Sequence, residues 1–462
     1  MTLLIQNGTL VTSTKTYQSD ILISNGKIIQ ISEKINPPTS KTEIIDATNK
    51  LILPGAIDGH THLAMPFGGT ISSDDYYTGT LAAACGGTTT VFDFALQDSG
   101  ETLTETLKRR DELAKTDVCV DYSFHIAIKD LSTDEIMKSV KDVIEQGITS
   151  FKVFMVYDFF VNDKMFYIIL KKIKEEGGLL GVHAENKGVI DALIEQFKEE
   201  GKTSAWYHYL SRPEFVEEEA INRAVSFAKS LHAPLYIVHL ACKGGVEIIQ
   251  KARDEGYPIF SETCIQYLHF TNEVFKRENA IEFVCSPPMK GEESKQALWN
   301  GIKNGTIQTI ATDHCPFKKS EKLWGENDFI KIPNGCSGVE NMYPFMLSHA
   351  NSGDISFNKV VELCCTNPAK LFGIYPQKGD LIVGGDADIV LYDREKVMTI
   401  SVDNMHSNVD HTIWEGLEMK GYPVRTYCRG QLVYCDGEFV GKRGFGQRVF
   451  CNKLHFDSNE LK

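Results

Sequence analysis

Short apolar runs alternate with amphipathic stretches along most of the chain. Eight β-branched, apolar segments stand out: LILPGAIDGHTHL, GTTTVFDFAL, VDYSFHIAI, GITSFKVFMVY, GGLLGVHAEN, PLYIVHLA, YPIFSETCI and IQTIATDHCPF. Between them, segments such as DEIMKSVKDVIEQG and EFVEEEAINRAVSFAKSLH have the spacing of amphipathic helices. A strand followed by a helix, repeated eight times, predicts an α/β fold with a (β/α)8 TIM barrel. An open doubly wound sheet is disfavoured because no GxGxxG motif follows the first strand.

The two ends of the chain instead have the pattern of short β-strands joined by tight turns. LLIQNGTLV and DILISNGKIIQI predict hairpins that turn at Asn7 and Asn25, because Asn-Gly supplies the positive φ values of tight turns. The same pattern recurs near the other end in GDADIVLYD and in VRTYCRGQLVYCDGEFVG, which has a turn at Asp436. We therefore expect a small β-sandwich domain built from both termini, residues 1–52 and 376–462, around a barrel of residues 53–375.

Polar side chains recur where the predicted barrel strands end. His60 and His62 are two apart, so they point to the same face of a strand and can bind one metal ion. Later strands carry Lys152, His183, His239 and Asp313. Taken singly, Lys152, His183 and His239 would each more often be a structural residue, but the recurrence of such side chains at the carboxyl ends of strands predicts a metal site at the barrel mouth. A divalent cation there lowers the pKa of bound water and so favours hydrolysis.

Composition narrows the possible partners and the compartment. The formal net charge of −14, from 48 basic and 62 acidic residues without a basic patch, disfavours nucleic acid and anionic membranes as partners. No run approaches the length of a membrane span, and MTLLIQNGTLVTSTK lacks a basic region followed by a long apolar stretch. The 12 cysteines are scattered without a CxxC pair, as expected of reduced thiols. We expect a cytoplasmic protein.

The polar set belongs to longer motifs that cover nearly the whole chain. They are HTHLAMPFGGT, ACGGTTTVFDF, FKVFMVY, VHAEN, VHLAC, SETCIQYL, CSPPM, ATDHCPF, KIPNG and CRGQLVYCDGEFVGKRGFGQ. On these motifs the chain resembles the cyclic amidohydrolases, specifically the hydantoinase and dihydropyrimidinase group, and its loops are most similar to those of bacterial D-hydantoinases. The resemblance implies a homotetramer that acts on a small cyclic ureide.

The resemblance also implies two divalent metal ions per subunit. His60, His62 and Asp313 would bind the more buried ion, and His183 and His239 the more exposed one. Lys152 would be carboxylated to N6-carboxylysine and bridge both ions. A free lysine, with a pKa of about 10.4, would repel two cations, whereas its carbamate is an anionic ligand. Histidine-rich sites suit zinc, although other first-row ions are not excluded.

Catalytic and substrate-binding roles follow from the same resemblance. A hydroxide held between the ions would attack a ring amide carbonyl, while Asp313 takes the proton and passes it to the departing nitrogen. The phenol of Tyr157 would stabilise the oxyanion. Ser286 in CSPPM and Asn334 in KIPNG would bind the imide edge, largely through backbone groups; without the resemblance they predict only turns.

The loops around the site bear on the substrate. Dihydroorotases of this family have an arginine after the HxH motif that holds a carboxylate, whereas Leu63 and Ala64 stand here. We therefore expect 5-substituted hydantoins or dihydropyrimidines, opened to N-carbamoyl amino acids, rather than dihydroorotate. An apolar pocket for the ring substituent is predicted, with simple loop packing as the alternative, from Met65, Phe67, Phe159 and Phe160.

Two alternatives remain open within the family. Allantoinases share the metal set, and some relatives are non-catalytic scaffolds that have lost the ligands. All six ligand positions are occupied here, which favours an enzyme. Ala64, where many hydantoinases have aspartate, and the unusual Asp158-Phe159-Phe160 segment leave the preferred ring and its hand undetermined.

Overall fold

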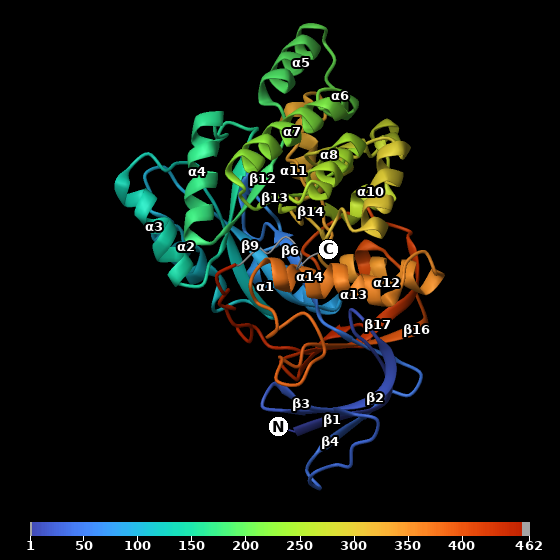
Figure 1. The fold of residues 1–462 in the computed structure, drawn as a ribbon. Coiled ribbons are helices and arrows are strands. Elements are labelled where there is room, and N and C mark those ends of the chain that lie inside the picture. Colours follow the sequence, from blue (N-terminus) through green and yellow to red (C-terminus); the bar gives the residue numbers. More distant parts are fainter. Residues whose placement is uncertain (1, 455–462) are drawn as a thin grey trace.

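A barrel of eight parallel strands forms the centre of the computed structural model, which describes residues 2–454 (Figure 1). The first and last strands come together through a hydrogen bond of 2.9 Å from the His62 amide to the His314 carbonyl and through a bridge between Thr61 and His314. Every strand predicted from the apolar runs is confirmed, in the order β6 (Ala56–Thr61), β9 (Thr88–Leu96), β10 (Asp121–Ala127), β11 (Ser150–Phe154), β12 (Leu179–His183), β13 (Leu235–Ile237), β14 (Ile259–Cys264) and β15 (Thr309–Ala311).

Helices surround the barrel and bury the outer faces of its strands (Figure 1). The predicted amphipathic segments form α3 and α7, whose buried positions are mostly apolar. The α-helices are α1 (Tyr76–Cys85), α2 (Leu103–Ala114), α3 (Asp134–Glu145), α4 (Asp163–Glu176), α5 (Lys187–Glu199), α6 (Ala205–Leu210), α7 (Glu214–Leu231), α8 (Lys243–Asp254), α9 (Ile265–His269), α10 (Glu292–Asn304), α11 (Lys319–Lys322), α12 (Met342–Ser352), α13 (Phe357–Val361) and α14 (Asn367–Leu371).

Short helical turns and one small hairpin complete the barrel domain. They are the 3-10 turns η1 (Asn272–Lys276), η2 (Ala280–Phe283), η3 (Leu323–Gly325) and η4 (Phe329–Lys331), the π-helical turn η5 (Glu362–Thr366), and the hairpin of β7 (Pro66–Phe67) and β8 (Thr70–Ile71). None of the helices within residues 2–454 combines the length and apolarity that crossing a membrane requires.

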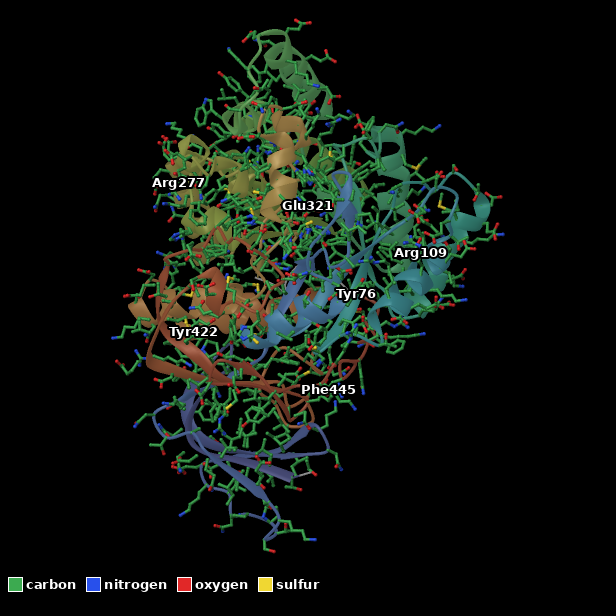
Figure 2. The ribbon with its side chains drawn as sticks, turned by 180° about the vertical axis from the view of Figure 1, so that it is seen from behind. Tyr76, Arg109, Arg277, Glu321, Tyr422 and Phe445 are labelled. Atoms are coloured by element: carbon green, nitrogen blue, oxygen red, sulfur yellow. The ribbon has the colours of Figure 1, made fainter. Side chains whose placement is uncertain are left out.

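A second, mixed sheet of nine strands combines both ends of the chain, as predicted, and lies below the barrel in Figure 1. Its strands are β1 (Thr2–Val11), β2 (Thr16–Ser24), β3 (Lys27–Ser32), β4 (Glu43–Asp46), β5 (Leu51–Pro54), β16 (Ile389–Thr399), β17 (Glu418–Cys428), β18 (Gln431–Cys435) and β19 (Glu438–Phe439), with the turn η6 (Val402–Asn404) after β16. In the reverse view, the labelled Tyr422, which belongs to β17 of this sheet, and Phe445 lie between the amino-terminal strands of the sheet and the barrel (Figure 2).

One predicted turn in this sheet is wrong. Asn25 does connect two strands, β2 and β3, and Asp436 connects β18 and β19. Asn7, however, lies inside the continuous strand β1, where the register with β2 shifts between Ile5 and Gly8. Its φ of 64° forms a bulge, and its backbone N–H donates to the side chain of Asp20 on β2, Oδ1 at 2.9 Å, rather than to a backbone carbonyl.

The apolar run before His60 is divided between the two sheets. β5 pairs with β1 and β16 in the small sheet, whereas β6, which begins one residue later, pairs with β9 in the barrel. Gly55 makes the crossing, and a Cβ there would lie 2.2 Å from Thr89 Oγ1. The chain therefore passes from sheet to barrel without a linker.

A buried cluster of charges joins the sheet to the amino ends of the barrel strands. Lys378 Nζ lies 2.7 Å from Asp121, the first residue of β10, 2.6 Å from Asp388 and 3.2 Å from Asp386. Arg429 Nε lies 3.0 Å from Asp121. The small sheet thus packs under the barrel and leaves the carboxyl ends of the strands to the site.

Candidate active site

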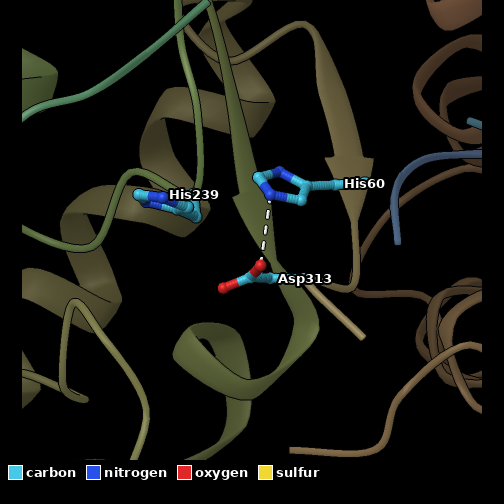
Figure 3. Close-up of side chains that lie close together, drawn as sticks. All are labelled: His60, His239 and Asp313. Carbon is cyan, nitrogen blue, oxygen red and sulfur yellow. Dashed lines mark ion pairs between the residues drawn. The ribbon is translucent and has the colours of Figure 1, made fainter. Parts of the chain in front are cut away.

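The six residues predicted as metal ligands converge at the carboxyl ends of the barrel strands. His60 lies on β6, Lys152 on β11 and His183 at the end of β12, while His62, His239 and Asp313 follow β6, β13 and β15. Donor atoms of His60, His239 and Asp313 all lie within 4.8 Å of one another (Figure 3). The alternating pattern of strand side chains explains this convergence, because Lys152 faces inward while its neighbours Phe151 and Val153 join the main hydrophobic core.

Close contacts link these side chains. Asp313 Oδ1 lies 3.1 Å from His60 Nε2 and 3.0 Å from His62 Nε2, and Lys152 Nζ lies 3.1 Å from His60 Nε2. The His183 and His239 ring centres are 4.4 Å apart. The structure therefore brings all six predicted ligands into one cluster.

Several nitrogens in the cluster lack the partners that buried polar groups require. Neither ring nitrogen of His239, nor Nδ1 of His62, has a hydrogen-bond partner among residues 2–454, although these atoms are buried. Burial lowers the pKa of His239 well below its usual value, which keeps the ring neutral, and lowers the pKa of Lys152 to about 8. Neutral imidazoles, a carboxylate and a readily deprotonated amine are a donor set that fits divalent metal ions.

Backbone strain is concentrated at the same place. Tyr157, His239 and Asp313 adopt φ values of 72°, 40° and 52°, a region that non-glycine residues seldom occupy. Each costs on the order of 1 kcal/mol or more, and such strain persists where the surrounding structure fixes a functional geometry.

The predicted substrate residues line one cavity with the cluster. The cavity has a volume of about 60 Å³ and includes Tyr157, Ser286 and Asn334 in its wall. Asn334 Nδ2 donates to Ser286 Oγ at 3.1 Å, and the Tyr157 ring lies 5.3 Å from that of His183. Burial raises the pKa of Tyr157 above its usual value, so that its phenol remains a proton donor.

Apolar side chains line the entrance, as predicted in part. Met65, Phe67 and Phe159 lie in the wall of the cavity and of a wider vestibule of about 870 Å³ that opens from it. Phe160 lines neither space; it is exposed, with its ring 5.8 Å from Lys187 Nζ. The entrance therefore has an apolar wall without Phe160.

Comparison with known proteins places this architecture in a family. The model of the amidohydrolase family matches residues 51–433. This chain belongs to the amidohydrolase family. It is 42% identical over 455 residues to a D-hydantoinase of Geobacillus stearothermophilus, covering 97% of this chain and 96% of that protein. It is 38% identical over 451 residues to a D-phenylhydantoinase of Escherichia coli, covering 97% of each. The solved structure of a dihydropyrimidinase from Brevibacillus agri superposes with a TM-score of 0.96 at 40% identity, covering 99% of this chain and all of the other.

The amidohydrolase site also contains carboxylates that the sequence motifs did not single out. Glu262 accepts from His60 Nδ1 and from the His239 backbone N–H at 3.1 Å. Glu185 lies 2.7 Å from His183 Nε2 and accepts from Arg212 Nη1 at 2.6 Å. Such carboxylates fix the orientation of a ligating imidazole and raise its basicity. An acidic residue inside the predicted strand YPIFSETCI was the available signal for Glu262, and the glutamate two positions after His183 was the signal for Glu185.

Proposed function

We propose that this amidohydrolase opens the cyclic amide bond of 5-substituted hydantoins or dihydropyrimidines and releases N-carbamoyl amino acids. The observation that carries the proposal is the cluster of four histidines, Lys152 and Asp313, all of which except His60 line a cavity shared with Tyr157, Ser286 and Asn334. The names of the relatives, D-hydantoinase, D-phenylhydantoinase and dihydropyrimidinase, support it.

The donor set supports a site for two divalent ions, which we expect to be zinc. His60, His62 and Asp313 would hold one ion, His183 and His239 the other, and Lys152 would bridge them as N6-carboxylysine. When bound, the metals would activate the nucleophilic water and polarise the ring carbonyl. The lowered pKa of Lys152 supports carboxylation, because only the neutral amine forms a bond with the carbon of CO2, with loss of a proton.

The protein's own groups would then manage protons and position the ring. Asp313 is placed to accept the proton of the attacking water and to pass it to the departing ring nitrogen. The phenol of Tyr157 would donate a hydrogen bond to the carbonyl oxygen as it gains charge, a contribution on the order of 3 kcal/mol. Ser286 and Asn334 would bind the imide edge.

The apolar entrance favours a substrate with an apolar substituent. Met65, Phe67 and Phe159 offer such a wall, and Leu63 and Ala64 after the HxH motif offer no cation for a ring carboxylate. We also propose a cytoplasmic homotetramer with the domain ranges 1–52, 53–375 and 376–462.

A substrate panel tests the proposed function. The protein, purified with zinc and bicarbonate, is assayed on dihydrouracil, D- and L-5-phenylhydantoin, allantoin and dihydroorotate, and its metal content is measured. We expect hydrolysis of dihydrouracil or of the 5-phenylhydantoins to exceed that of dihydroorotate. Preference for allantoin would identify an allantoinase, and a folded, metal-free protein that opens none of these rings would contradict the proposal.

A further inference from the structure

Lys322, the last residue of α11, has a completely buried ammonium group next to the substrate cavity. Its Nζ donates to the carbonyl oxygens of Val284 at 2.9 Å, Pro333 at 2.8 Å and Gly335 at 2.7 Å. These bonds use all three ammonium protons, and Lys322 forms no ion pair within residues 2–454. A buried cation is costly unless its surroundings compensate it, so its placement among three carbonyls requires an explanation.

The three carbonyls belong to the two loops that carry the proposed imide-binding residues. Val284 lies two residues before Ser286, and Pro333 and Gly335 flank Asn334. The Gly335 backbone N–H also donates to the Val284 carbonyl at 2.9 Å, so the loops are joined twice. Lys322 therefore connects the segment of Ser286 to that of Asn334.

Other buried groups hold the remaining carbonyls near Ser286. His208 Nε2 lies 2.9 Å from the Cys285 carbonyl oxygen, and the Tyr267 hydroxyl donates to the Pro287 carbonyl at 2.8 Å. In contrast, the backbone N–H and C=O groups of Ser286 and Asn334 have no protein partner within residues 2–454. Both residues line the cavity. The backbone groups of Ser286 and Asn334 are thus available to a ligand, whereas the carbonyls of the residues on either side of each are held by other side chains.

The helix that carries Lys322 also contacts the entrance. Glu321 accepts from the Thr70 hydroxyl of β8 and from the backbone N–H of Lys318, the latter at 2.8 Å. Glu321 is labelled in Figure 2, in the barrel half of the molecule and away from the small sheet. One short helix thus contacts the entrance hairpin and both ring-binding loops.

We propose that Lys322 is a positioning residue, whose ammonium fixes the two loops so that the free backbone groups of Ser286 and Asn334 present one edge to the imide of the substrate. The inference rests on the proposed function and adds to it a specific determinant of ring binding. Lys322 touches neither the ring nor the proposed metal ligands, so its loss weakens ring binding while leaving the metal site loaded.

The test compares Lys322→Met with Lys319→Met. Methionine retains much of the lysine volume and removes the charge and the three donors. Lys319 lies on the same helix, with its side chain 52% exposed and paired with Glu282 at 2.7 Å, and serves as the matched control. KM, kcat, metal content and Tm are measured with whichever cyclic ureide the wild-type protein opens.

We expect Lys322→Met to raise KM by about tenfold or more at wild-type metal content, with a smaller change in kcat, because binding of the ring in the ground state is lost. Lys319→Met should leave both constants within about twofold, because the half-exposed Lys319 bonds to none of the carbonyls of the two loops. Lys322→Gln, which retains two donors, should give an intermediate KM. A purely structural role for Lys322 would instead lower Tm and the active fraction while leaving KM unchanged.

Each remaining outcome decides the question. An unchanged KM in Lys322→Met or Lys322→Gln overturns the positioning role, and so does a failure of both variants to fold, since Lys322 would then act in folding. If the wild-type protein itself opens no cyclic ureide, the proposed function fails, and that result is distinct from an active wild-type protein whose KM does not depend on Lys322.

Discussion

Lys152 occupies surroundings that do not suit a permanent cation. Its Nζ lies over the rings of Phe94 and Phe154, 4.4 and 4.8 Å from their centres, and 3.1 Å from His60 Nε2. An exposed lysine would be almost fully protonated at neutral pH, whereas burial lowers the pKa of this one to about 8. A larger fraction of Lys152 than of an exposed lysine is therefore present as the neutral amine.

This pKa predicts how carboxylation depends on pH. In metal-free protein supplied with bicarbonate, uptake of CO2 at Lys152 should increase as the pH rises through about 8, because the neutral amine becomes the main form. Mass spectrometry under non-acidic conditions, or NMR with labelled bicarbonate, measures the uptake. Lys152→Ala should show none and should lose activity, whereas Lys171→Ala, at an exposed helix position, should behave as wild type. Equal uptake by Lys152→Ala would refute the assignment.

Glu185 gives a second prediction at this scale. Burial alone would raise its pKa, but Arg212 and His183 outweigh that effect and hold the pKa far below its usual range. Glu185→Gln retains the shape and removes the charge that orients His183. We expect zinc affinity to fall about 10- to 100-fold, with activity restored by excess zinc. Titration with a competing chelator measures the affinity, and Glu200→Gln, at an exposed position away from the site, is the control. Unaltered affinity would argue against Glu185 as the support of His183.

At the scale of elements, the pattern of apolar residues predicts which segments form strands better than it predicts which sheet each strand joins. The eight barrel strands follow from apolar runs with polar ends, because parallel strands covered on both faces need continuous apolar sequence. LILPGAIDGHTHL shows one such run, yet it contains two strands that belong to different sheets. The sequence does not reveal the division at Gly55, because it depends on the tertiary packing of that residue against Thr89. Asn7 was predicted as a turn because local chemistry cannot separate a bulge from a hairpin.

The cluster at Lys378 joins elements that the sequence does not relate. Lys378→Met would leave Asp121, Asp386 and Asp388 buried together without their shared cation. We expect a loss of about 3 to 5 kcal/mol in the free energy of unfolding. Lys27→Met removes a 45% exposed lysine from the same Asp386 and should cost less than about 1 kcal/mol. Urea denaturation of both variants measures the difference, and equal stabilities would show that the cluster does not hold the sheet to the barrel.

At the scale of the whole molecule, the residues of the candidate site could be predicted from the sequence, whereas the residues that hold its loops in place could not. The proposed metal ligands could be selected from the motifs, because metal binding requires particular residue types, which here stand at strand ends: His60, His62, Lys152, His183, His239 and Asp313. Lys322 could not, since its function depends on three backbone carbonyls that no motif encodes. Side chains that act through the backbone therefore require the structure.

The shared sheet makes both ends of the chain necessary for folding. A chain that begins at residue 55 would lack β1 to β5 and expose the edge of β16, which pairs with β5. We expect this truncated chain to aggregate, because it presents an unpaired apolar strand. Soluble yield and size-exclusion chromatography test this, and co-expression of residues 1–54 should restore solubility. A monodisperse truncated barrel would contradict the prediction.

The direct passage from β5 to β6 limits how this molecule can move. Because only Gly55 separates β5 from β6, a rotation of the nine-stranded sheet as a rigid body would also move β6, the strand that bears His60. A hinge motion between the two sheets would therefore also displace a proposed metal ligand. The segments that can move without disturbing that strand are the hairpin of β7 and β8 and the loop that follows β11, both of which border the vestibule.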